Sequence, residues 1–135
     1  MKNIVCAIAV LVNSSASAQE MAPIFHNGSR GIITRDKGIV EIRYETPRSG
    51  LPVKEGTVLF SGRWDEHGNY EGVAYTFKRG CDPAPYRVTG KDAGPGIILT
   101  GIPPRRDPHG CAVIGTNATV KHSRLVFEYE IEDHN

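Results

Sequence analysis

No apolar run in this sequence is long enough to cross a bilayer. The longest, residues 4–12, falls well short of the roughly 20 residues that a transmembrane helix needs. Net charge is also scarce, at a formal +1 at pH 7, so the chain lacks the basic surface that binds nucleic acid or an anionic membrane. We therefore expect neither a nucleic-acid partner nor stable membrane insertion.

The first residues have the pattern of a secretory signal peptide. Lys2 gives a positive start, residues 4–12 an apolar core, and Ala16-Ser17-Ala18 a small-residue cleavage site. Lys2 is the only charged residue in this segment, so its removal would leave acidic and basic side chains in balance. We predict a signal peptide at residues 1–18 and one exported β domain at residues 19–135, located in the periplasm or secreted.

Cysteine is rare, and one of the three, Cys6, lies within the predicted signal. Cys81 and Cys111 would remain, and two cysteines in an oxidising compartment normally pair. The chain has no Cys-x-x-Cys motif, which disfavours a redox pair or a metal site. We predict a Cys81–Cys111 disulfide that closes a loop of about 30 residues and stabilises the fold by roughly 3–4 kcal/mol.

The sequence also lacks the spacings that catalytic and metal sites use. None of the five histidines lies two or four residues from another, and there is neither a Gly-x-Ser-x-Gly elbow nor a phosphate-binding loop. The adjacent side chains of Asp65, Glu66 and His67 would point apart on a turn and stay solvated. We predict that the protein is not an enzyme and uses no metal or cofactor.

Strand patterns recur along the predicted domain, whereas no amphipathic helix is evident. Val40, Ile42 and Tyr44 alternate with polar residues, as in a half-buried antiparallel strand. This spacing of strands and turns predicts an all-β, single-domain antiparallel sandwich or small β-barrel of seven or eight short strands with one disulfide. The other expected strands are residues 31–34, 57–64, 70–77, 86–89, 97–102, 111–115 and 125–132.

Two local expectations are more detailed. Residues 19–30 show little periodicity and are expected to form an extended arm that becomes ordered only if it docks on the rest of the domain. Residues 57–77 predict a β-hairpin around Gly68-Asn69. In that hairpin Val73, Tyr75 and Phe77 are expected to face inward, with Trp64 at the centre of the core.

The segment 101–111 differs from the other loops. Three prolines stiffen it, the expected disulfide holds its far end, and it carries two arginines and a histidine. A stiff cationic loop costs little to order on binding and suits an acidic cleft, although an ordinary solvated turn is the alternative. The predicted partner-binding residues are Arg105, Arg106, Asp107 and His109.

In general plan the chain resembles the small exported bacterial inhibitors of lysozyme and related peptidoglycan hydrolases. The resemblance covers the signal, the all-β pattern and the single disulfide. Ser61-Gly62-Arg63-Trp64 has only the first two residues of the Ser-Gly-x-x-Tyr pattern of one branch, so no family site residue is carried over. The resemblance implies a non-enzymatic protein that inhibits or controls a peptidoglycan hydrolase by protein–protein contact.

Two other functions remain open at this point. A β-barrel that binds a small ligand or a glycan would need a pocket lined by aromatic residues such as Tyr44, Phe60, Tyr75 or Phe127. A structural envelope protein would instead show a large apolar patch and form a stable oligomer.

Overall fold

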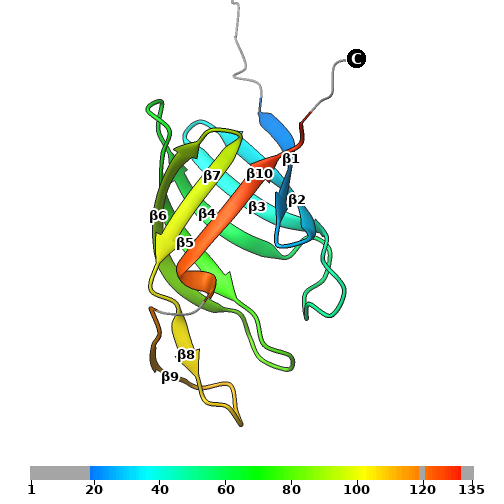
Figure 1. The fold of residues 1–135 in the computed structure, drawn as a ribbon, viewed down its shortest axis with the longest axis vertical. Coiled ribbons are helices and arrows are strands. Elements are labelled where there is room, and N and C mark those ends of the chain that lie inside the picture. Colours follow the sequence, from blue (N-terminus) through cyan, green and yellow to red (C-terminus); the bar gives the residue numbers. More distant parts are fainter. Residues whose placement is uncertain (1–18, 119–120, 132–135) are drawn as a thin grey trace, which may run out of the picture.

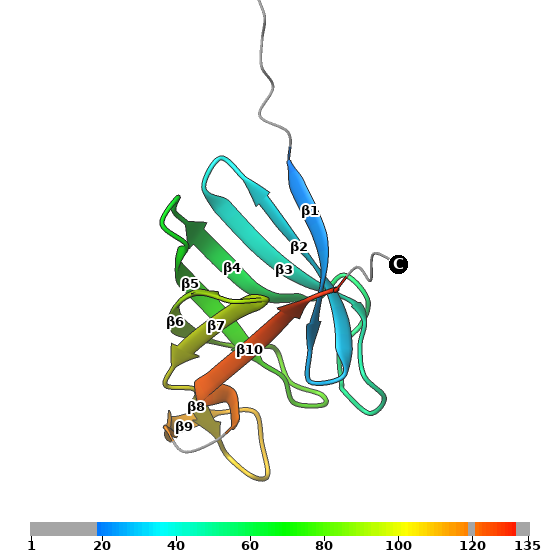
Figure 2. The same cartoon turned by 45° about the horizontal axis from the view of Figure 1, so that its top comes forward.

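The computed structural model describes residues 19–118 and 121–131, and within them the chain is all-β. Eight antiparallel strands form a closed barrel, and two further strands form a separate small sheet (Figures 1 and 2). The predicted fold class is confirmed, in its barrel form. The predicted signal peptide lies outside the described residues. The barrel strands are β1 (Glu20–His26), β2 (Ser29–Asp36), β3 (Ile39–Thr46), β4 (Val58–Trp64), β5 (Asn69–Thr76), β6 (Ala84–Ala93), β7 (Gly96–Gly101) and β10 (Arg124–Tyr129).

The barrel is a meander with one insertion. Each strand from β1 to β6 pairs with the next, β7 pairs with β10, and β10 closes the barrel against β1. The insertion between β7 and β10 contains β8 (Pro104–Arg106), β9 (Val113–Thr116) and a 3-10 turn, η1 (Lys121–Ser123). Across the described ranges, no helix has the length and apolar character to cross a membrane.

The predicted N-terminal arm is instead part of the barrel. Residues 19–30 contain β1, a tight turn and the start of β2. Asn27 and Gly28 in the turn have φ of 46° and 78°, the left-handed conformation of a two-residue hairpin turn. The extended segment is ordered because it pairs with β2 and β10. The prediction missed the hairpin because it did not use Asn-Gly, a strong hairpin signal that outweighs the weak periodicity of the strand before it.

The hairpin of β4 and β5 forms as predicted, but β5 turns its other face inward. Tyr70 and Ala74 are buried, with 2% and 0% exposure, whereas Val73 and Tyr75 are only half-buried. Both faces of this strand carry apolar side chains, so alternation alone does not choose between them. Pairing of Phe60 with Ala74 decides the choice in the structure.

Side chains fill the interior of the barrel. Phe60 and Phe127 are buried at its centre, and the void that remains beside Phe127 has a volume of only about 10 Å³. The space beside Phe127 is therefore too small for a ligand at the centre of the barrel. The other core residues are Ile24, Ile33, Val40, Ile42, Tyr44, Leu59, Tyr70, Ala74, Tyr86, Val88, Ile97, Leu99 and Leu125.

One end of the barrel is closed by an arginine within a cage of aromatic rings. The guanidinium carbon of Arg35 lies 5.4 Å from the ring centroid of Trp64 and 5.7 Å from those of Tyr70 and Tyr129. Arg35 donates hydrogen bonds to both tyrosine hydroxyls, and Tyr70 donates to Asp92 at 2.8 Å. Trp64 is half-buried and belongs to this end cap. The prediction that it lies at the centre of the core was wrong.

Candidate functional site

The barrel end opposite the Arg35 cage carries the long connections. Loop 47–57 joins β3 to β4, loop 77–83 joins β5 to β6, and the insertion 102–123 joins β7 to β10. The caged end has only short turns, at residues 37–38, 65–68 and 94–95. Figure 1 shows this asymmetry, with the insertion extending away from the barrel. The long-connection end is therefore the candidate functional end.

Within the insertion, β8, β9 and the turn between them form a projecting hairpin, residues 104–116. Its two strands pair with each other and not with the barrel sheet. Both views place it beyond the end of β7 and β10 (Figures 1 and 2). A two-stranded hairpin is at best marginally stable alone, so contacts with the rest of the protein must hold it.

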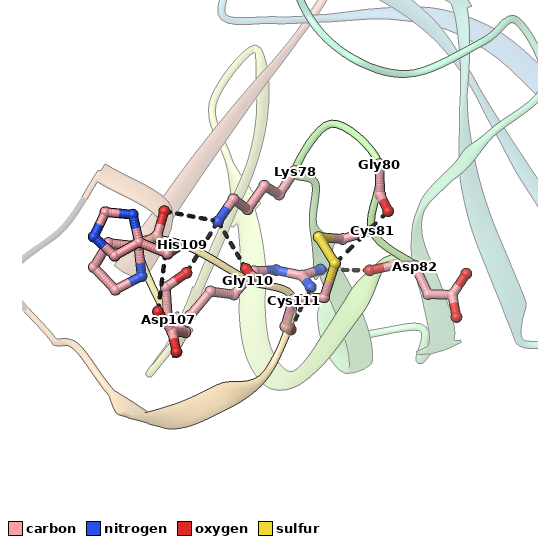
Figure 3. The surroundings of a disulfide bond; sticks show 10 residues. Lys78, Gly80, Cys81, Asp82, Asp107, His109, Gly110 and Cys111 are labelled. Atoms are coloured by element: carbon pink, nitrogen blue, oxygen red, sulfur yellow. Dashed lines mark hydrogen bonds between the residues drawn. A yellow bond between two sulfur atoms is a disulfide. The ribbon is translucent and has the colours of Figure 1, made fainter.

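The predicted disulfide is one of these contacts. Cys81 in the β5–β6 loop is bonded to Cys111 in the hairpin, with Cα atoms 5.4 Å apart (Figure 3). The sequence separation of 30 residues means that the bond removes many conformations of the unfolded chain. It fixes the hairpin to the β5–β6 loop.

Lys78 provides a second attachment beside the disulfide. Its ammonium group donates to three backbone carbonyl oxygens of the hairpin turn: those of Asp107 at 3.0 Å, Pro108 at 3.3 Å and Gly110 at 2.7 Å. Figure 3 shows the three bonds converging on one nitrogen. Bonds from a charged donor are stronger than neutral ones, so the turn is held in one shape.

Arg106, one of the predicted partner-binding residues, is a third attachment. Its guanidinium donates to the carbonyl oxygens of Cys111, at 3.0 Å, and Asp82, at 2.5 Å. The side chain is half-buried and its charged group is directed to the protein's own backbone. Arg106 therefore shapes the hairpin.

Asp107 and His109 form the turn of the hairpin. The carboxylate of Asp107 accepts a hydrogen bond from the backbone N–H of His109 at 2.9 Å, a local bond typical of aspartate in turns. The His109 side chain is exposed. Of these two residues, His109 is the one that presents its side chain to solvent.

Arg105 is the exposed arginine of the pair. Among the described residues it takes part in no ion pair. It lies opposite Gly115 in the hairpin, and its guanidinium lies over this glycine, where a Cβ would be 3.6 Å from Nη2. Its charge is thus available to a partner.

The hairpin also exposes apolar side chains that the sequence did not single out. Val113 and Ile114 are 55% and 50% exposed, and Ile102 at the base of the hairpin is 58% exposed. Residues 111–115 were predicted to be a strand of the main fold, which would bury one face. Because the small sheet has no second layer, both faces of β9 stay exposed.

Comparison with protein-family models, curated proteins and solved structures finds no match for this chain. The described residues contain no cluster of three or more histidine, cysteine, aspartate or glutamate side chains arranged to hold a metal ion. Among the described residues, the long-connection end is the region whose geometry points to a function.

Proposed function

We propose that this protein is an exported binding protein that inhibits or controls a peptidoglycan hydrolase, by placing the projecting hairpin in the acidic cleft of the enzyme. The observation that carries the proposal is that the hairpin is held at three points yet leaves Arg105, Val113 and Ile114 exposed. We place the protein in the periplasm or outside the cell, in keeping with its disulfide and the secretory pattern of residues 1–18.

A hairpin held in this way loses little conformational freedom on binding. Association normally costs free energy for ordering loops and side chains, and an element that is already ordered avoids part of that cost. Exposed Val113 and Ile114 would lose water on contact with a partner, which favours binding in proportion to the apolar area buried. The hairpin thus has the mechanical and chemical properties of a binding element.

The exposed arginine suggests the chemistry of the partner. Glycoside-cleaving sites hold two carboxylates on either side of the scissile bond. The guanidinium of Arg105 can donate two parallel hydrogen bonds to one carboxylate, which a lysine ammonium cannot match in geometry. Arg105 in that cleft would block the substrate and form hydrogen bonds with one of the two catalytic carboxylates.

The test is an inhibition assay with residues 19–135 and an intact disulfide. Peptidoglycan hydrolysis by a muramidase and by a lytic transglycosylase is followed with and without the protein. We expect inhibition of at least one enzyme, and we expect Arg105→Ala to weaken it by about tenfold or more, as truncation of a central arginine commonly does. A variant with Val113→Ser and Ile114→Ser should also be weaker.

The matched control is Arg63→Ala, an exposed arginine in β4 near the caged end. It should inhibit as well as the parent. If the hydrolases are unaffected and none is retained from an envelope extract by the immobilised protein, the proposal fails. Equal inhibition by the parent and Arg105→Ala would remove the hairpin from the mechanism.

A further inference from the structure

A second candidate site lies at the same end of the barrel but apart from the projecting hairpin. It is a pocket of about 200 Å³ in the mouth of the barrel, which we call the mouth pocket. The turn after β1, loop 47–57, the end of β5 and the start of β10 surround it, and no residue of the hairpin lines it. Its apolar lining consists of Leu51, Pro52, Leu59, Tyr75, Phe77 and Leu125.

One wall of the mouth pocket is aromatic. The rings of Tyr44 and Phe77 meet edge to face, with centroids 5.9 Å apart. An apolar cavity of about 150 Å³ can hold a benzene molecule, so the mouth pocket has room for a single six-membered ring with a small substituent. A larger ligand could place only a group of about this size in the pocket, with the rest of it extending into solvent.

The polar side of the mouth pocket is formed by Arg48 and the imidazoles of His26 and His122, and no aspartate or glutamate is among its lining residues. Arg48 gives this side its positive charge, whereas burial lowers the pKa of His26 and keeps that imidazole uncharged at neutral pH. In the described part of the chain, no carboxylate forms an ion pair with Arg48. Burial raises the pKa of Tyr44 to about 12, so its hydroxyl adds no negative charge at neutral pH. An anionic group would meet only attractive charge here.

The backbone at Arg48 is fixed before any ligand arrives. Ser29 is buried, with 3% exposure, and its hydroxyl oxygen accepts a hydrogen bond of 2.8 Å from the Arg48 N–H. This bond ties loop 47–57 to the start of β2, and both residues line the mouth pocket. Arg48 is therefore held at the rim by its backbone while its side chain remains exposed.

We infer that the mouth pocket binds a small monocarboxylate with an apolar or aromatic body. The body lies against Phe77, Leu59 and Leu125, and the carboxylate is bound by the guanidinium of Arg48. This activity goes beyond the proposed inhibition and does not depend on it, because the two sites share no residue.

The test uses benzoate as the probe, with the binding followed by methyl and amide NMR on residues 19–135. Benzoate should shift the resonances of Leu51, Leu59 and Leu125, with a Kd of about 1 mM or tighter, as expected for so small a ligand. Benzamide and benzylamine, which share its ring but lack the negative charge, should bind at least about tenfold more weakly, the loss expected for one charge-assisted contact.

Arg48→Gln should remove the preference for benzoate over benzamide, because it deletes the charge and keeps the backbone N–H that binds Ser29. Arg63→Gln, at the caged end, is the matched control and should bind as the parent does. Leu51→Trp should fill the mouth pocket and abolish binding. Hydrolase inhibition should survive both pocket variants, so failure of one proposal can be told from failure of the other.

Three results would overturn the inference. The first is equal binding of benzoate, benzamide and benzylamine, which would show an unselective apolar pocket. The second is benzoate binding that Arg48→Gln leaves unchanged. The third is an absence of shifts at the three leucines with benzoate while N-acetylglucosamine produces them, which would assign the pocket to a sugar.

Discussion

The ammonium nitrogen of Lys78 lies 2.7 Å from the carbonyl oxygen of Gly110, across the same junction that the disulfide closes. Lys78 precedes Cys81 by three residues and Gly110 precedes Cys111 by one. The disulfide and the Lys78 hydrogen bonds therefore connect the same two segments. The junction has a covalent component and a polar one. These two components can be removed separately.

We expect Lys78→Ala to loosen the hairpin without unfolding the barrel. Three carbonyl oxygens lose a charged donor, and water can replace it only in part because two of the bonds are partly buried. The loss of stability should be about 1–3 kcal/mol. Amide hydrogen exchange should become faster at residues 107–112, and the strands of the barrel should keep their protection.

Lys91→Ala is the control for this change, since Lys91 is an exposed lysine in β6 at the other end of the barrel. Its exchange pattern should match that of the parent. Unchanged exchange at residues 107–112 in Lys78→Ala would mean that the disulfide and Arg106 are sufficient to hold the turn.

Replacing both Cys81 and Cys111 by serine should cost about 3–4 kcal/mol, because the loop between them closes over about 30 residues. The barrel ladders do not depend on this bond, so the folded β-structure should persist at low denaturant concentration. Urea unfolding of oxidised parent and double variant measures the difference. A loss well under 1 kcal/mol would show that the unfolded chain is already restricted near this loop.

Much of this architecture can be predicted from the sequence. The features that cannot be predicted have one physical cause in common. Alternating apolar residues predict strands β3 and β10, and the two cysteines that lie outside the predicted signal peptide predict their pairing. The role of Lys78 leaves no such pattern, since its acceptors are backbone carbonyls that any residue provides. It becomes visible only once the hairpin has been placed.

The Arg35 cage shows the same limit. The backbone of Arg35 lies near the end of β2, beside the turn at residues 37–38. The rings that enclose it come from β4, β5 and β10, and their approach depends on the register of the whole barrel. These contacts join four strands and form only when the barrel closes, so no single stretch of the sequence predicts them.

Arg35→Met should destabilise the barrel by about 2–4 kcal/mol, because it removes hydrogen bonds from a charged donor together with cation–π contacts. The Arg35 side chain is only 12% exposed, so water does not compensate. Arg63→Met, the exposed counterpart in β4, should change stability by less than about 0.5 kcal/mol. Chemical denaturation of both variants gives the comparison, and equal values would show that the cage does not stabilise the closed end.

The last prediction concerns His26, whose ring stacks on Phe127 with centroids 4.7 Å apart. Burial lowers the pKa of His26 below its usual value of 6.5, and the nearby charges of His122 and Arg48 lower it further, against the opposing effect of a hydrogen bond to the Val126 carbonyl oxygen. NMR titration should therefore give His26 a pKa below 6.5.

The sign of the stability effect follows from this pKa. Below about pH 6.5 the unfolded chain binds a proton at His26 that the folded chain does not, so the free energy of unfolding falls as the pH drops toward the folded pKa. The parent should lose more stability than His26→Gln between about pH 7 and about pH 5. His67→Gln, at an exposed turn, should behave as the parent does. A pKa of His26 at or above 6.5, or equal losses in parent and His26→Gln, would show that the ring is charged and solvated in the folded protein.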